Sequence, residues 1–97
     1  MRVTWAPRAR DDLEDILRYI AQDDVAAAFR QTRRIESAVE NLARHPAMGR
    51  GGRKPGWREL VVAATPYVVM CRVLDDGVEI TAVVHGARAW PPDGGAA

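Results

Sequence analysis

Residues 57–85 read WRELVVAATPYVVMCRVLDDGVEITAVVH, and their apolar side chains follow a two-residue period. This period is typical of β-strands, because successive side chains of a strand point to opposite faces of the sheet. The pattern predicts three strands, over residues 57–62, 67–74 and 78–85. The intervening segments are short, and the second contains the Asp76-Gly77 pair that is typical of hairpin turns. Turns of this length join antiparallel neighbours, so we expect an antiparallel meander.

The residues ahead of this stretch have the period of an amphipathic helix. A first helix is expected over residues 7–21, with an apolar face of Ala9, Leu13, Ile16 and Ile20. Pro7 suits its first turn. Acidic side chains fill its first half, where the helix dipole favours negative charge, at Asp11, Asp12, Glu14 and Asp15.

A second helix is expected from the N-cap residue Asp24 to about Arg44, where His45-Pro46 disfavours further helix. Its apolar stripe comprises Val25, Ala28, Thr32, Ile35, Val39 and Leu42. Only a short break separates the two helices, so they form an antiparallel hairpin. Each helix has one apolar stripe, so another element must cover the hairpin.

The remaining segments complete an α+β fold of order β-α-α-β-β-β. Residues 2–5 are β-prone and are expected to join the sheet, and the Gly- and Pro-rich residues 45–56 are expected to form a loop. The helical hairpin should pack on one face of a small, mainly antiparallel sheet. Residues 1–90 are interpreted as a single domain, and 91–97 as a disordered tail.

The composition excludes several classes of protein. The chain of 97 residues is 47% hydrophobic and 28% charged with a net charge of +1, which is typical of one globular domain. A single cysteine, Cys71, excludes an internal disulfide and any zinc site built from cysteines. Neither a membrane span nor a signal peptide is predicted, so a cytoplasmic protein is expected. Arginine supplies 13 of the 14 basic residues, Lys54 being the exception.

The chain resembles the RelE/ParE superfamily of toxins from type II toxin–antitoxin operons. The resemblance covers about residues 3–90. It rests on an ordered set of segments: Trp5-Ala6-Pro7 with Ala9, Asp12-Leu13 and Ile16 to Ile20; Ile35 to Leu42 with His45-Pro46-Ala47-Met48-Gly49; Arg58-Glu59-Leu60; Tyr67-Val68-Val69 with Arg72-Val73; and Val84-His85-Gly86-Ala87-Arg88.

The resemblance implies one of two activities. RelE-like members cut mRNA on the ribosome, whereas ParE-like members inhibit DNA gyrase without nuclease activity. RelE-like enzymes use basic residues of the sheet and a C-terminal Tyr or His as the acid. Here Arg58 and Arg88 match basic positions, but Leu60 and Val68 occupy two others, and no Tyr or His follows Arg88. Because lost acid–base groups slow such cleavage by about 100- to 10,000-fold each, the gyrase inhibitor is favoured.

No catalytic residue is favoured under this interpretation. If the chain is a ribonuclease, the candidates are Arg58, His85 and Arg88, with His85 as the acid or base. The candidates for contacting the target or a phosphate are Arg50, Arg53, Lys54, Arg58, Arg88 and Trp90. Arg72 is instead expected to pair with Glu79 across a hairpin. No metal or other cofactor is expected.

The expected partners follow from the same resemblance. A cognate antitoxin, acidic to suit the arginine excess, would fold over the toxin and lay a helix or strand in an apolar groove beside the hairpin and the sheet edge. DNA gyrase is the expected target, and the ribosome with its mRNA is the alternative. Operator DNA would be contacted only through the antitoxin, because the near-zero net charge gives no general affinity for polyanions. A non-toxic remnant that only binds antitoxin is the third alternative.

Overall fold

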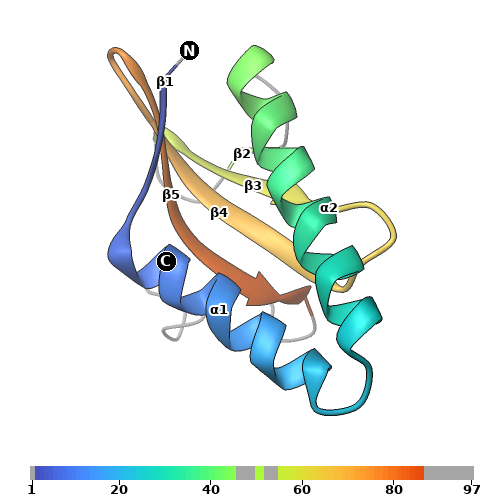
Figure 1. The fold of residues 1–97 in the computed structure, drawn as a ribbon. Helices are drawn as coiled ribbons and strands as arrows, with labels where there is room; N and C mark the ends of the chain where they lie inside the picture. The colour runs from blue at the N-terminus through green and yellow to red at the C-terminus, as the bar shows by residue number, and fades with distance from the viewer. Residues whose placement is uncertain (1, 46–49, 52–54, 87–97) are drawn as a thin grey trace.

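The computed structural model describes residues 2–45, 50–51 and 55–86 of the chain. A helical hairpin lies against one face of a five-stranded sheet of order β1-β5-β4-β3-β2 (Figure 1). Strand β1 runs parallel to β5, and the other neighbours are antiparallel. The elements are β1 (Arg2–Trp5), α1 (Pro7–Ala21), α2 (Val25–Arg44), β2 (Arg50–Gly51), β3 (Trp57–Val61), β4 (Tyr67–Leu74) and β5 (Gly77–His85).

The expected α+β fold and antiparallel meander are therefore confirmed, and residues 2–5 join the sheet as expected. One prediction was wrong: the segment 45–56 is not entirely loop, because Arg50–Gly51 forms the two-residue strand β2 against β3. Sequence periodicity cannot detect a strand this short. The predicted tail, 91–97, lies outside the described residues. None of the helices in the described ranges is long and apolar enough to cross a membrane.

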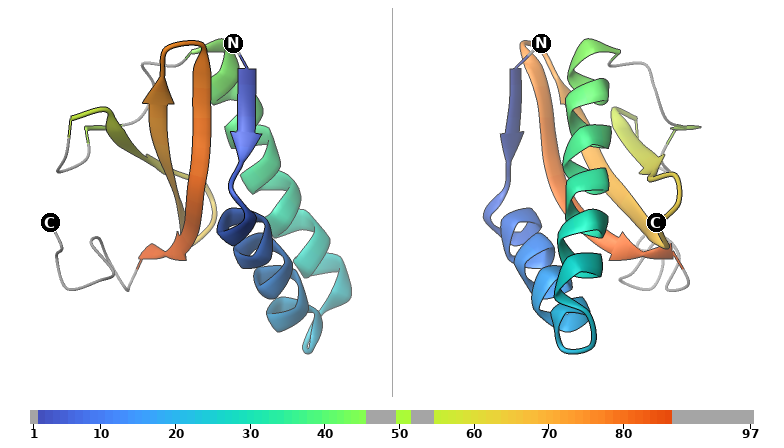
Figure 2. Two further views of the ribbon diagram at one scale, coloured as in Figure 1. Left: turned by 90° about the vertical axis from the view of Figure 1, so that its left-hand side faces the viewer. Right: turned by 45° about the vertical axis from the view of Figure 1, so that its right-hand side comes forward.

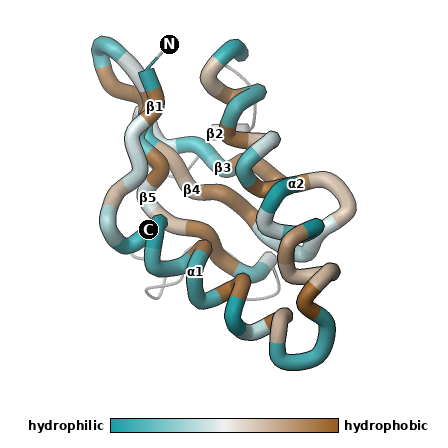
Figure 3. Tube along the Cα trace, viewed as in Figure 1, coloured by the Kyte–Doolittle hydropathy of each residue, from teal (hydrophilic) through white to brown (hydrophobic). Residues whose placement is uncertain are grey.

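The helices begin and end where the sequence predicts. Pro7 occupies the first turn of α1, where its missing N–H is not needed. The Asp24 carboxylate accepts the Ala27 N–H at 2.9 Å and so caps α2, whose last residue, Arg44, precedes His45-Pro46. The hairpin packs on the sheet through the α2 stripe of Ile35, Val39 and Leu42, and hydrophobic and hydrophilic residues alternate along both helices (Figure 3).

The acidic residues of α1 do not act as expected. None lies in the first turn of the helix. Instead, α1 follows β1 along the side of β5, where the Ala6 N–H donates to the Ile80 carbonyl at 2.8 Å. Further along the same side, within α1, the Asp12 carboxylate accepts the N–H of Val83 at 3.0 Å. The Asp12 side chain thus takes the place of a strand partner for β5 beyond Trp5, where β1 ends and α1 follows (Figure 2).

The hairpin between β4 and β5 differs in detail from the Asp-Gly turn that the sequence suggests. Asp75 and Asp76 form the connection, and Gly77 is already the first residue of β5. Gly77 has no positive φ, unlike Gly56. A Cβ at Gly77 would overlap the carbonyl oxygen of Arg2 in β1. Glycine is needed here because β1 approaches closely, not because of the turn.

Candidate functional site

The predicted basic residues are only partly described. Arg58 lies in β3 with a half-buried side chain, opposite Cys71 of β4. The backbone of Arg50 lies in the neighbouring β2, where Gly51 is paired with Arg58. The other candidates lie outside the described residues: Arg53, Lys54, Arg88 and Trp90.

Cys71 is a core residue beneath this edge of the sheet. Its thiol is fully buried and lies 3.7 Å from the Arg58 carbonyl oxygen, to which it donates. Burial raises the pKa of the Cys71 thiol to about 11, and the nearby Arg58 guanidinium offsets only part of that rise. At neutral pH the thiol is protonated and unreactive.

His85 ends β5 and is paired with Tyr67 at the start of β4, whereas Arg58 is paired with Cys71 near the middle of β4. The exposed His85 ring meets the buried ring of Tyr67 edge to face, with the centroids 5.7 Å apart and the planes at 82°. Burial raises the pKa of Tyr67 above its ordinary value of 10.0, and nearby Tyr19 raises it further. Tyr67 is therefore a neutral packing residue, and it holds the imidazole of His85 at the sheet end.

Arg58 and His85 do not converge on one point. Their partners on β4, Cys71 and Tyr67, are four residues apart, and β4 itself lies between the two strands. At about 3.3 Å per residue and 4.8 Å per strand, their Cα atoms are about 16 Å apart. Because strand side chains stand roughly perpendicular to the sheet, the Arg58 and His85 side chains do not meet at a single phosphate. Arg88, the third member of that set, lies outside the described residues.

The sheet face away from the helices carries an ordered row of polar side chains. The Arg72 guanidinium lies 3.2 Å from the Glu79 carboxylate, as the sequence predicted, and 5.6 Å from the centre of the Trp57 ring. These residues come from three adjacent strands in register. The charge of Arg72 is thus already used within the chain.

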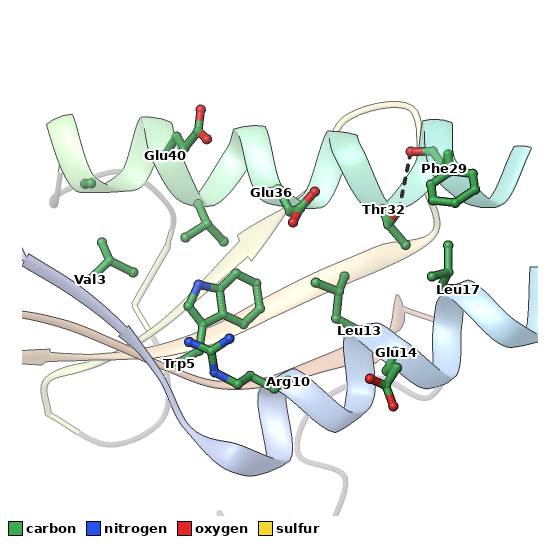
Figure 4. A pocket seen from close by; sticks show the side chains of 12 residues that line it. Val3, Trp5, Arg10, Leu13, Glu14, Leu17, Phe29, Thr32, Glu36 and Glu40 are labelled. Atoms are coloured by element: carbon green, nitrogen blue, oxygen red, sulfur yellow. Dashed lines mark hydrogen bonds between the residues drawn. The ribbon is translucent and has the colours of Figure 1, made fainter. Parts of the chain in front are cut away.

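A groove that the sequence did not locate lies between the two helices and β1 (Figure 4). It has a volume of about 720 Å³. Most of its lining is apolar, and its charged lining residues are Glu36 and Glu40 on α2 and Arg10 and Glu14 on α1, with the carboxylates of Glu40 and Glu14 projecting away from the space between the helices. Its apolar lining includes Val3, Trp5, Leu13, Leu17, Phe29 and Val39.

Two of these groove residues show why it was missed. Trp5 and Leu13 read as ordinary core residues, and they do pack against the core, but they also face the open groove. The available signal was the flank of α2, where Glu36 and Glu40 stand one turn apart beside the apolar stripe. Among the described residues, no group of three or more His, Cys, Asp or Glu side chains is arranged to hold a metal ion.

Comparisons with known proteins place this fold and groove in context. The family model described as the ParE toxin of the type II toxin–antitoxin system parDE matches residues 3–90. The chain is 46% identical over 90 residues to the putative toxin Y4kP of Sinorhizobium fredii, which covers 93% of both chains. It is 40% identical over 87 residues to toxin RelE2 of Caulobacter vibrioides, covering 90% of this chain and 97% of that relative.

Solved structures share the fold. A chain of the chromosomal ParDE system from P. aeruginosa superposes with a TM-score of 0.76 at 24% identity, covering 88% of this chain and 95% of that one. The E. coli DinJ-YafQ toxin–antitoxin complex has a chain that superposes at 0.58 with 10% identity, covering 92% and 96%. At these identities the likeness establishes the fold alone.

Proposed function

We propose, from the premise that this chain belongs to the ParE toxin family of type II toxin–antitoxin systems, that it arrests growth by inhibiting DNA gyrase. As a toxin of the RelE/ParE superfamily, it has an antitoxin as its partner. Gyrase is the proposed target, and the cytoplasm is the proposed place of action because gyrase works there. Relatives carry both ParE and RelE names, so the choice of target rests on the residues of this chain.

The observation that carries the proposal is the identity of two strand residues. By resemblance, Leu60 and Val68 match two positions at which RelE-like ribonucleases carry basic side chains. Leu60 is only 7% exposed and belongs to the hydrophobic core, so the position faces the helices rather than a substrate. Val68 is half-buried between Val61 and Val84 on the other sheet face. Cations are needed to stabilise the phosphate during RNA cleavage, and these two positions supply none.

The test measures both activities on the same purified chain. We expect it to inhibit DNA supercoiling by gyrase and to leave mRNA on programmed ribosomes intact. Unchanged supercoiling together with codon-specific cuts on the ribosome would show that the chain is a ribonuclease. Absence of both activities, with no growth arrest after induction without antitoxin, would identify a non-toxic remnant.

The proposed target-contacting residues are Arg50, Arg53, Lys54, Arg58, Arg88 and Trp90. Arg58→Ala tests the one among them whose side chain the structure describes. Arg30→Ala is a matched control, because Arg30 is an exposed arginine on the outer side of α2. We expect Arg58→Ala to weaken gyrase inhibition and Arg30→Ala to leave it unchanged. Equal inhibition by the two variants would remove Arg58 from the proposed contact surface.

The groove is the proposed site of the antitoxin. Phe29 is 57% exposed at one end of it, and a helix with an apolar side fits such a groove. Phe29→Asp is expected to weaken antitoxin binding. Val25→Asp is the control, because Val25 is 58% exposed on the same helix but does not line the groove. Equal losses for the two variants would place the antitoxin elsewhere.

A further inference from the structure

The groove has the length of a short helix. Its α2 wall runs from Phe29 to Ala43, a span of about 21 Å at 1.5 Å per residue. A helix of about 14 residues has the same length. The floor beneath it is apolar, so the occupant must present one apolar side.

The α2 wall carries two uncompensated negative charges. Glu36 and Glu40 are exposed, stand one turn apart on α2 and both line the groove, although the Glu40 carboxylate projects away from α1 (Figure 4). Like charges at this spacing repel each other within a helix. Neither carboxylate forms an ion pair or a side-chain hydrogen bond in the described part of the chain, whereas several neighbouring carboxylates do.

The α1 wall has a different charge. The Glu14 carboxylate lies 2.8 Å from the Arg18 guanidinium, so its charge is already balanced. Arg10 lines the same wall and makes no ion pair with any described residue. Two unpaired carboxylates on α2 therefore face one unpaired guanidinium on α1, so Arg10 offsets part of the negative charge and the groove stays negative on balance.

Segments of this chain do not meet the requirements for the occupant. Residues 87–97 contain two prolines and a Gly-Gly pair, which disfavour a helix, and only one basic residue. The exposed side of α2 presents Arg30, Arg33 and Arg34 without an apolar stripe between them, so a second copy would not fill the floor. Because the family is defined by toxin–antitoxin pairs, the occupant to which the charge argument applies is a segment of the antitoxin.

We infer that the groove selects an antitoxin segment of about 14 residues that folds as a helix and directs Lys or Arg side chains at Glu36 and Glu40. This inference rests on the proposed antitoxin site and adds the charge of the segment. It adds to the expectation of an acidic antitoxin that the segment in the groove is basic on the side toward α2. The two glutamates are then determinants of which antitoxin is accepted.

The first experiment uses two synthetic peptides of 14 residues with the same leucine stripe, one with lysine and the other with glutamate at the four flanking positions. Their binding to the purified full chain is measured by fluorescence anisotropy. We expect the lysine peptide to bind more tightly, and Glu36→Gln/Glu40→Gln to weaken it by about 2- to 30-fold, the range for two exposed ion pairs. Tighter binding of the glutamate peptide would overturn the inference.

The control variant is Ser37→Lys/Asn41→Lys. It shifts the net charge by the same two units at the same level of α2, on exposed positions that do not line the groove. We expect it to change lysine-peptide binding by less than twofold at 0.15 M salt, where charges are screened beyond about 8 Å. Equal losses in the two variants would mean that net charge, rather than the groove wall, governs binding.

The second experiment uses the antitoxin encoded by the neighbouring gene. If it binds the wild-type chain and the Glu36→Gln/Glu40→Gln variant equally well, the inference fails while the proposed antitoxin function stands. If it does not bind the wild-type chain at all, the proposed function fails, and the two peptides still decide the charge preference of the groove. A 2- to 30-fold loss confined to the glutamate variant supports both.

Discussion

The contact between Asp12 and β5 makes the sharpest prediction about stability. The Val83 N–H is buried at the edge of the sheet beyond the end of β1, and the Asp12 carboxylate is its acceptor at 3.0 Å. Asp12→Ala leaves that N–H without a protein partner. A buried group left unsatisfied costs about 1–3 kcal/mol. We therefore expect the free energy of unfolding to fall by about 2 kcal/mol.

The neighbouring Asp11 provides the matched control. Asp11 is exposed on the same helix, so Asp11→Ala removes the same charge and gains the same helix propensity, up to about 0.7 kcal/mol. The difference between the two variants isolates the hydrogen bond. Arg8→Ala separates a second contribution, because the Arg8 guanidinium lies 3.7 Å from Asp12 in an exposed pair worth at most about 1 kcal/mol.

Urea denaturation followed by circular dichroism measures these differences as shifts of the midpoint at constant slope. Asp12→Asn should recover part of the loss, since its amide oxygen can still accept the Val83 N–H. Amide hydrogen exchange at Val83 should accelerate in Asp12→Ala and not in Asp11→Ala. Equal midpoints for Asp12→Ala and Asp11→Ala would refute the reasoning.

Three further predictions concern the strands and turns. Gly77→Ala should destabilise the fold in thermal unfolding, because the added Cβ would overlap the Arg2 carbonyl oxygen. The expected loss is about 1–3 kcal/mol, the range for a strained backbone. A neutral result would contradict the close approach of β1. Ala64 has a φ of 63° in the turn after β3, a left-handed conformation that glycine adopts more readily than alanine. Ala64→Gly should therefore stabilise the folded chain by up to about 1 kcal/mol in the same assay. A loss of stability would be evidence against the left-handed conformation. Burial raises the pKa of Cys71 from 9.0 to about 11. The folded chain therefore holds the thiol proton more tightly than the unfolded chain does. The free energy of unfolding should fall as pH rises from about 9 to 11, by at most about 1.4 kcal/mol per pH unit. Cys71→Ser should flatten this decline in urea midpoints measured across that range, and an unchanged decline would assign it to other groups.

The sequence predicted those parts of the fold that repeat with a regular period. The bounds of both helices follow from Pro7, Asp24 and His45-Pro46, each of which acts on the adjacent backbone alone. Strand β2 was missed because two residues carry no period. The Asp12 contact was missed because its partner, Val83, is 71 residues away, and local rules assign an acid near a helix start to the dipole.

The candidate site was less predictable for a related reason. The pairing of Arg72 with Glu79 was predicted correctly, whereas the residues proposed for a target surface stay a prediction. The sequence could not show that Arg58 and His85 lie apart along β4, because that distance depends on strand register. The groove depends on the angle between two helices and on the position of β1, and neither is encoded in the period of a single segment.

The parallel pairing of β1 with β5 has a consequence for how the chain folds. Arg2 is opposite Gly77, so the first strand to be synthesised finds its partner only in the last one. Among the strands of the described ranges, β5 is also the only neighbour of β1. Pairings this distant in sequence form slowly, because closing the long loop costs conformational entropy before any stabilising contact forms. A growing chain therefore cannot complete its sheet until nearly the whole domain has been synthesised, and a chain truncated before Gly77 leaves β1 without a partner strand.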